Sequence, residues 1–217
     1  MTNVSHDLKT PLTSIISYAD LLAQEELPPQ AADYVHILQE KAARLKAMVQ
    51  DVFDISKAAS GQLPIKPKHL DLGKLLRQTL ADMSQAVEDS GLALRTALPE
   101  DAVPVYADGD RLYRVFQNLL GNALKYSLPG TRVYLALVTQ GRQALVTLKN
   151  TSAAELRPGT DYTGRFVRGD ESRTDGGSGL GLSIAQSFTQ ACNGDLRVET
   201  DGDLFTVRVT LPLDSLS

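Results

Sequence analysis

Apolar residues recur at alternating spacings of three and four through the first 60 residues, the pattern of helices that pack along a seam. The first stretch places its seam at Leu8, Leu12, Ile15, Ala19 and Leu22. Leu27-Pro28-Pro29 then breaks the helix, because proline lacks an amide donor and restricts the residue before it. The seam resumes at Tyr34, Leu38, Lys41, Leu45, Met48, Val52, Ile55 and Ala59. This pattern predicts a helical hairpin. Since two helices alone bury little apolar surface, we expect two hairpins to form a dimeric four-helix bundle.

One glycine and two prolines between residues 61 and 67 indicate a linker, beyond which the pattern becomes mixed. Helices are expected over Leu72–Val87, Arg111–Lys125 and Ser178–Cys192. Strands are expected over Leu92–Leu98, Val103–Ala107, Arg132–Thr139, Gln143–Lys149, Leu196–Thr200 and Leu204–Leu211. We therefore predict an α+β chain with a hairpin (1–60), a linker (61–70) and an α/β sandwich domain (71–217), whose helices cover one face of a mixed sheet.

Composition narrows the partners and the compartment. The formal net charge of −4 argues against nucleic acid as a partner. A single cysteine, Cys192, excludes an intrachain disulfide and suits a reducing cytosol. No apolar run approaches the roughly 18 residues that span a bilayer. Because His6 belongs to a helix that is already under way at the first residues, we expect the chain to be a cytoplasmic fragment of a longer protein.

His6 lies in the segment SHDLKTPLTSI, residues 5–15, one position off the helical seam. Thr10 follows at i+4 on the same face, and Asp7 is adjacent. A carboxylate that accepts a hydrogen bond from imidazole Nδ1 leaves Nε2 with a lone pair for attack on phosphorus. Pro11 is expected to bend the helix just beyond His6. The other interpretation is a surface histidine on a bundle helix, and the neighbours of His6 favour the nucleophile.

The predicted helix over residues 111–125 carries Asn118, Asn122 and Lys125 at i, i+4 and i+7, within one narrow arc. Amide oxygens are hard ligands suited to a Mg²⁺ ion that phosphates already partly neutralise, and a lysine at this spacing can reach phosphate oxygens. The alternative is an ordinary polar helix face. Because asparagine is only a middling helix former, two on one stripe favour a functional role.

A glycine-rich run, GGSGLGL over residues 176–182, stands directly before an apolar-periodic helix. Free backbone amides and the helix dipole favour a phosphate there, although flexible surface loops share this composition. The polar stretch before it, residues 151–177, holds Arg165, Arg168 and Arg173. These arginines are either solvated surface charges or cations that approach a γ-phosphate when the segment closes as a lid. The three motifs together indicate phosphoryl transfer from ATP to a protein histidine.

These segments resemble the catalytic core of a two-component sensor histidine kinase, over essentially the whole chain. SHDLKTPLTSI resembles the phosphoacceptor box of that family, and NLLGNALKYS, residues 118–127, resembles its N box. RFVRGDESR, residues 165–173, resembles the F box, and GSGLGLSIA, residues 177–185, the second glycine box. The resemblance implies an ATP-dependent protein-histidine kinase that also needs Mg²⁺.

By this resemblance His6 is the phosphorylated residue and Asp7 its acid/base partner. Thr10, at the family's H-D/E-x-x-N/T spacing, orients the water that dephosphorylates the response regulator. The implied reactions are autophosphorylation, transfer to an aspartate of the regulator's receiver domain, and phosphatase action on that regulator. The family also implies a homodimer through the hairpin and a parent protein attached to the membrane through its N-terminal part.

The resemblance assigns a nucleotide site as well. Asn122, helped by Asn118, holds Mg²⁺. Lys125 and Tyr126 contact the nucleotide, and Arg168 approaches the γ-phosphate. The second glycine box contributes Gly177, Gly179, Leu180 and Gly181.

One segment departs from the family pattern. The family's first glycine box, D-x-G-x-G, ends a strand, and its Asp binds the adenine amino group. The matching residues 150–154 read NTSAA, so an amide replaces the carboxylate and both glycines are absent. Asn150 can still accept a hydrogen bond from the adenine amino group, but the turn after it must differ.

Two alternatives come from other functional classes. ATP-hydrolysing relatives of the gyrase, chaperone and mismatch-repair type use a glutamate where this chain has Asn118, and an amide cannot take a proton from water. A catalytically weak or dead dimerisation module is favoured only by the altered first glycine box. Nucleotide binding measured together with phosphohistidine formation separates the three functions.

Overall fold

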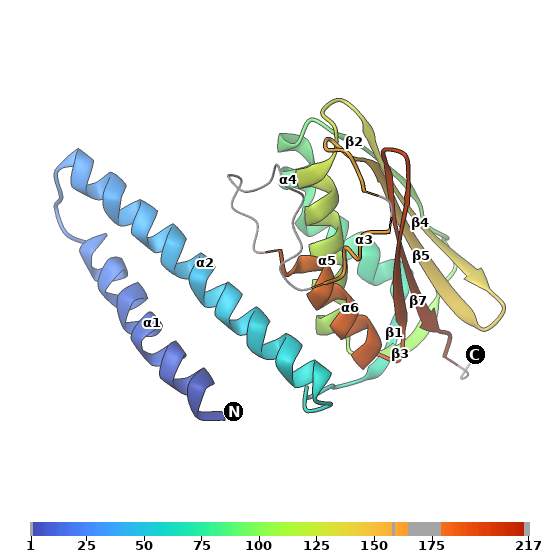
Figure 1. The fold of residues 1–217 in the computed structure, drawn as a ribbon, viewed down its shortest axis with the longest axis horizontal. Coiled ribbons are helices and arrows are strands. Elements are labelled where there is room, and N and C mark those ends of the chain that lie inside the picture. Colours follow the sequence, from blue (N-terminus) through green and yellow to red (C-terminus); the bar gives the residue numbers. More distant parts are fainter. Residues whose placement is uncertain (1, 158, 165–178, 215–217) are drawn as a thin grey trace. The chain divides into compact units, whose positions relative to one another are not determined.

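The computed structural model describes the backbone of residues 2–157, 159–164 and 179–214, with side chains from residue 7 onward. The chain forms two compact units, Met1–Lys57 and Ala58–Ser217. The first unit is helical, and the second combines helices with two β-sheets (Figure 1). This is the predicted α+β organisation. None of the described helices is both long enough and apolar enough to cross a membrane.

The first unit is a hairpin of α1, Thr2–Leu22, and α2, Pro29–Ala59, the last two residues of which belong to the second unit (Figure 1). Pro29 occupies the first position of α2, where a missing amide donor costs little. The amides of Ala31 and Ala32 donate to the Pro28 carbonyl at 2.8 and 3.0 Å. The two prolines therefore separate the helices as predicted, and the second of them starts α2.

The hairpin by itself covers only part of the predicted seam. Leu12 and Ala19 of α1 are buried as predicted, and so is Ile55 of α2. Earlier on α2, Val35 and Ala42 are buried in place of the expected Tyr34 and Lys41. Several seam residues are exposed: Leu8, Ile15, Leu22, Tyr34, Leu38, Leu45 and Val52. The first part of the α2 seam is thus displaced by one residue from the prediction, whereas Ile55 is in the predicted register. We call these seven exposed residues the apolar row.

The second unit is built on a five-stranded mixed sheet in the order β2-β4-β5-β7-β6. Its strands are β2 Ala93–Ala97, β4 Arg132–Gln140, β5 Gln143–Thr151, β6 Asp195–Asp201 and β7 Leu204–Pro212. Strand β2 runs parallel to β4, and every other neighbouring pair is antiparallel. The turns between β4 and β5 and between β6 and β7 contain Gly141 and Gly202, with φ of 58° and 54°.

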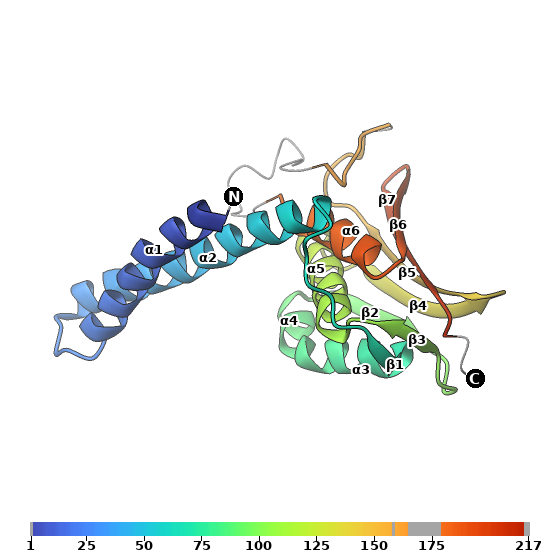
Figure 2. The ribbon, with the colours of Figure 1, turned by 90° about the horizontal axis from the view of Figure 1, so that it is seen from below.

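Helices cover one face of this sheet, as predicted (Figures 1 and 2). They are α3 Leu72–Asp82, α4 Ser84–Asp89, α5 Gly109–Tyr126 and α6 Gly181–Ala191. Strands β4, β5 and β7 alternate buried and more exposed residues, which gives the sheet one apolar face for the helices. Fully buried side chains of this core include Phe116, Leu120, Leu135, Phe188 and Leu211.

Two parts of the second unit differ from the prediction. Residues 72–87, expected as one helix, form α3 and α4 with a break at Met83. The Thr79 hydroxyl donates to the Leu75 carbonyl at 2.9 Å, a bond that tends to bend helices, and α4 buries no residue. A small sheet was also missed: β1, Lys68–Asp71, pairs antiparallel with β3, Pro104–Ala107. β1 lies at the end of the expected linker, where KHLD shows no apolar alternation.

Candidate functional site

Helix α5 is fixed at both ends. Asp108 Oδ1 accepts from the amides of Asp110 and Arg111 at 3.1 and 3.2 Å, which caps the N-terminus. The Ser127 hydroxyl donates to the Ala123 carbonyl at the other end. One face is buried, through Leu112, Val115, Phe116, Leu119, Leu120 and Ala123. The polar stripe beside this face is therefore held in a fixed position by the core.

Asn118 and Asn122 lie on this stripe and are half-buried. Neither side chain hydrogen-bonds to any residue that the structure describes. The Asn122 amide lies against Gly181, because a Cβ on Gly181 would stand only 3.2 Å from Asn122 Nδ2 and 3.4 Å from Oδ1. Packing of α5 on α6 thus places an open amide at the start of α6.

Helix α6 begins at Gly181 and has no side-chain cap. The carbonyl of buried Leu180 accepts from the Ile184 amide and the Ser183 hydroxyl, both at 2.9 Å. Gly179 has φ of 67°, a left-handed conformation that favours glycine. The first amides of α6 and the helix dipole are therefore available to an anion beside Asn122.

Asn150 lies on the helix-covered face of the sheet near the end of β5, opposite Val133 on β4 and Phe205 on β7. The residue is only 5% exposed. Its amide makes no hydrogen bond to the described residues, and its polar atoms are not among those sealed from solvent. A buried side chain with an unpaired amide that solvent still reaches is well suited to a ligand.

The chain after Asn150 is tied to the end of α5. The Leu128 amide donates to the Thr151 carbonyl and the Ala153 amide to the Tyr126 carbonyl, both at 2.9 Å. Where the family has glycines, the Ser152 hydroxyl accepts from the Ala154 amide at 3.3 Å. The turn thus differs from a glycine-based turn, and a serine side chain closes it.

Lys125 and Tyr126 stand at the end of α5, next to this turn. Lys125 is exposed, and its Nζ lies 5.2 Å from the centroid of the half-buried Tyr126 ring. These two residues place a cation and an aromatic ring at the end of α5, close to the segment that follows Asn150.

Two aromatic residues near Asn150 were missed by the sequence prediction. Phe205 is paired with Asn150 in the sheet register, and the Tyr162 ring meets it edge-on, with centroids 5.5 Å apart. The Tyr162 hydroxyl accepts from the Arg157 amide at 2.9 Å. Next to it, hydrogen bonds from the Thr163 hydroxyl and amide to the Asp161 carboxylate lower the pKa of Asp161. Alternation along residues 205–211 predicts that Phe205 faces inward, but the sequence does not reveal which residue of β5 it meets.

His6, Asp7 and Thr10 lie in the other unit, on α1. The backbone of His6 is helical, and its side chain lies outside the described residues. Asp7 and Thr10 are exposed, and the Ser14 hydroxyl donates to the Thr10 carbonyl at 3.3 Å. The predicted phosphoacceptor residues therefore share a helix that is separate from the unit with the nucleotide motifs.

Within the second unit, the predicted nucleotide residues that the structure describes are Asn118, Asn122, Lys125, Tyr126, Asn150, Gly179, Leu180 and Gly181. They gather around the C-terminal half of α5 and the start of α6. Arg168 and Gly177 lie outside the described residues. No three His, Cys, Asp or Glu side chains group as metal ligands in the described part of the chain. The oxygens offered to a cation on this stripe are amide oxygens.

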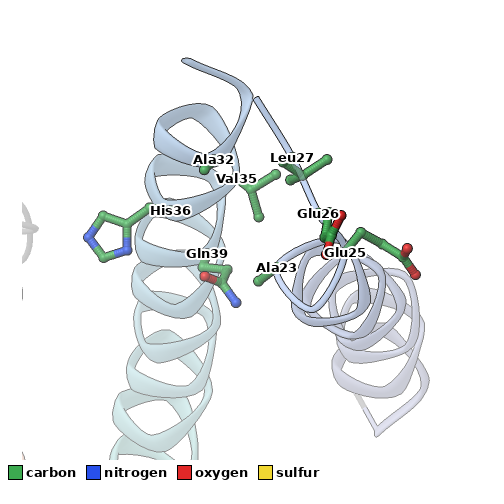
Figure 3. Close-up of a pocket in the computed structure, with 8 residues that line it drawn as sticks. All are labelled: Ala23, Glu25, Glu26, Leu27, Ala32, Val35, His36 and Gln39. Carbon is green, nitrogen blue, oxygen red and sulfur yellow. The ribbon is translucent and has the colours of Figure 1, made fainter. Parts of the chain in front are cut away.

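A cavity of about 470 Å³ lies elsewhere, beside the turn of the hairpin (Figure 3). None of the predicted site residues lines it. The exposed His36 ring points away from the space between the two helices. Gln39 Nε2 joins the helices by donating to Asp20 Oδ1 at 2.8 Å. The cavity is lined by Ala23, Glu25, Glu26, Leu27, Ala32, Val35, His36 and Gln39.

Comparison with known proteins connects both units to described families. Residues 1–61 match the His Kinase A (phospho-acceptor) domain. Residues 107–215 match the histidine kinase-, DNA gyrase B-, and HSP90-like ATPase family.

Relatives match both units in the same order. The sensor protein VanS of Enterococcus faecium is 33% identical over 213 residues, which are 96% of this chain and 55% of VanS. The sensor protein VanSC of Enterococcus gallinarum is 30% identical over 220 residues, 96% of this chain and 59% of VanSC. The crystal structure of full-length ShkA in complex with AMPPNP has a TM-score of 0.84 at 26% identity, over 100% of this chain and 46% of ShkA.

The chain thus spans little more than half the length of the two curated relatives. A phospho-acceptor domain is followed by an ATPase-type domain in one chain, and the nucleotide motifs occupy the second of them. This protein belongs to the sensor histidine kinases and comprises the catalytic core of that family.

Proposed function

We propose that this chain uses ATP to phosphorylate His6 and passes the phosphoryl group to an aspartate of a response-regulator receiver domain. The observation that carries the proposal is the set of unpaired amides of Asn118 and Asn122, beside the uncapped start of α6, and of Asn150, next to the turn tied to the end of α5. We propose residues 1–60 as the phosphotransfer hairpin, 61–70 as the linker and 71–217 as the ATP-binding domain.

The ATP-binding residues divide by the part of the nucleotide they contact. Asn150 accepts from the adenine amino group, and Lys125 and Tyr126 contact the nucleotide at the end of α5. Gly177, Gly179, Leu180 and Gly181 hold the phosphates at the N-terminus of α6, and Arg168 approaches the γ-phosphate. The free amide oxygens of Asn122 and Asn118 fit Mg²⁺, which would neutralise phosphate charge when bound.

The chemical step is nucleophilic substitution at phosphorus. The Nε2 lone pair of His6 forms a bond to the γ-phosphorus, and the bond from that phosphorus to the β–γ bridging oxygen breaks, so that ADP leaves with the electron pair. Asp7 accepts a hydrogen bond from Nδ1 and stabilises the imidazolium as it forms. Asn118 has no proton-accepting carboxylate, which disfavours water as the nucleophile.

The hairpin is the proposed dimerisation surface. The apolar row leaves large side chains such as Leu38 at 53% and Ile15 at 52% exposure. A second copy of the hairpin would cover the same row on its partner and complete a four-helix bundle. The receiver domain of the regulator would meet the exposed face of α1 that carries His6.

Incubation of the full chain with ATP and Mg²⁺, followed by mapping of acid-labile phosphate, tests the kinase function. We expect one phosphorylated histidine, His6. Steady ADP release without protein phosphate would instead indicate an ATPase, and absence of nucleotide binding would indicate an interaction module.

Thr10 is proposed to orient the water that dephosphorylates the regulator. Thr10→Ala should keep autophosphorylation and lose phosphatase activity, because a hydroxyl positions water but is no strong base. Thr13→Ala is the matched control, since Thr13 is exposed on the same helix. Dephosphorylation at the wild-type rate by Thr10→Ala would contradict this role.

A further inference from the structure

The end of the expected linker is bound to the ATP-binding unit. Helix α2 ends at Ala59, and the Gly61 amide, at φ of 66°, donates to the Ala58 carbonyl at 3.1 Å. From Lys68 onward the chain is strand β1. Between these points, the Lys66 amide donates to Asp108 Oδ2 at 2.8 Å. Residues 60–65 therefore connect α2 with this bond, and the side chain of Leu63 among them is buried, at 8% exposure.

Asp108 uses its two carboxylate oxygens for different purposes. Oδ1 accepts from Asp110 and Arg111 and caps α5, whereas Oδ2 accepts from Lys66 across 42 residues of sequence. The residue is 6% exposed. A hydrogen bond from an amide to a buried carboxylate is stronger than a neutral one, so this bond is a firm anchor.

Strand β1 is held by further contacts that do not involve Asp108. Its residue His69 contacts Asp214, which follows β7, through Nδ1. The His69 ring lies 4.9 Å from the Tyr106 ring on β3, and the Asp214 amide donates to the Pro104 carbonyl at 2.9 Å. Loss of the Lys66 bond would therefore free residues 66 and 67 while β1 stays in place.

We propose that Asp108 is a positioning residue for the phosphoryl transfer: its Oδ2 holds Lys66 and fixes the point at which the linker leaves the ATP-binding unit. The inference rests on the proposed kinase function. His6 and the nucleotide motifs lie in different units, so the linker that joins the units helps to set how the bound ATP meets the imidazole.

The anchor acts on the encounter of the two units and not on nucleotide affinity. Asn122 is 14 residues from Asp108, which places it about 20 Å along α5. If Lys66 is released, the stretch between α2 and the next anchored residue grows from residues 60–65 to 60–67, and the effective concentration of one unit near the other falls by about 1.5-fold. Lost orientation adds to this decrease.

Asp108→Asn tests the anchor with little change of shape. The amide oxygen keeps the cap, but the NH₂ group in place of Oδ2 cannot accept from Lys66. Asp71→Asn is the matched control. Asp71 also caps a helix, and its Oδ1 accepts from Gly73 at 2.9 Å and Val103 at 3.1 Å, so an amide oxygen keeps both bonds. The substitution removes only the partly exposed ion pair of Oδ2 with Arg77 Nη2 at 3.8 Å, a contact that contributes little.

In the full chain, Asp108→Asn should speed deuterium exchange of segment 62–67 by about tenfold. That segment contains two prolines, so few amides contribute to the measurement. The kcat of His6 phosphorylation should fall by about twofold or more, while the KM for ATP and the exchange of α5 stay at wild-type values. Asp71→Asn should match the wild type in every measurement.

An unchanged or higher kcat overturns the positioning role. A raised KM, or faster exchange throughout α5, also overturns it, because Asp108 would then act only by supporting the helix. If the wild type binds ATP but gains no phosphate, the kinase function has failed and the positioning role falls with it. The exchange of segment 62–67 then still shows whether Asp108 holds the linker.

Discussion

The two units differ in how much of their apolar side-chain surface they bury. The second unit buries its large side chains between a sheet and helices, with Phe116, Leu120 and Phe188 at 2% exposure or less. The hairpin buries Leu12 and Val35 but leaves the apolar row exposed, although it is the smaller unit. An exposed row of this kind is typical of an interaction surface, and we propose that a second hairpin covers it.

This difference shows where each unit obtains its stability. A sheet with helices on one face closes a core within one chain, whereas a two-helix hairpin has no third layer to cover its outer apolar stripe. The catalytic domain is expected to fold by itself, and the hairpin is expected to depend on association.

The predicted nucleophile and the nucleotide motifs also lie in different units. His6→Gln should have the largest effect, on phosphorylation. Phosphate incorporation should disappear, while ATP affinity stays within about twofold because the nucleotide motifs lie in the other unit. His36→Gln, an exposed histidine on α2, is the control and should keep full incorporation. Radiolabel incorporation and nucleotide titration measure both quantities. Phosphate on the His6→Gln protein would identify a different nucleophile.

Phe188→Ala should strongly destabilise the second unit, because that unit encloses its own core. The side chain is 0% exposed and lies under Arg111 and Arg114, whose guanidinium carbons are 4.9 and 5.4 Å from the ring centroid. We expect a loss of about 3–5 kcal/mol in the unfolding free energy of the second unit. Tyr134→Ala, at a residue 47% exposed on β4 of the same unit, should cost about 1 kcal/mol or less. Denaturant titrations that gave equal losses would contradict a self-contained core.

Leu45→Glu should weaken association of the hairpin. Burial of a leucine contributes about 1.5–3 kcal/mol, so the dimer dissociation constant should rise by about tenfold or more. Leu45 is 46% exposed in the single chain, so the monomer loses little. Ala47→Glu places the same charge at an exposed position on another side of α2 and should leave the dimer intact. Sedimentation of both variants measures the change, and equal dissociation constants would exclude the apolar row as the interface.

Substitutions of Asn150 should give the smallest effect. A carboxylate accepts a stronger hydrogen bond from the adenine amino group than an amide does, so Asn150→Asp should tighten ATP binding severalfold and discriminate better against GTP. Asn150→Ala should weaken ATP binding. Lys149→Ala, at the exposed neighbouring position of β5, is the control. If Asn150→Ala binds ATP as the wild type does, the adenine is held elsewhere.

Regular patterns let the sequence predict most of the fold. Alternation along β4, β5 and β7 and the helical period of α5 placed these elements within a few residues of their ends. The prediction was wrong where the pattern is weak: β1 has four residues without alternation, and the break at Met83 follows a side-chain bond of Thr79. Short elements depend on their neighbours more than on their own residues.

The sequence by itself determined which chemical groups this protein carries and on which elements they stand. His6 with Asp7 and Thr10 on a helix, the amides of α5 and the glycines before α6 follow from residue type and local spacing. Local spacing is readable because backbone sterics give helices and strands fixed periods.

Only the tertiary structure decided which of these groups meet. The contact of Asn122 with Gly181, the pairing of Asn150 with Phe205 and the bond from Lys66 to Asp108 join residues far apart in sequence. Such contacts depend on helix packing and strand register, which the whole core sets together. The same packing fixed which side of each hairpin helix is buried and which side stays exposed.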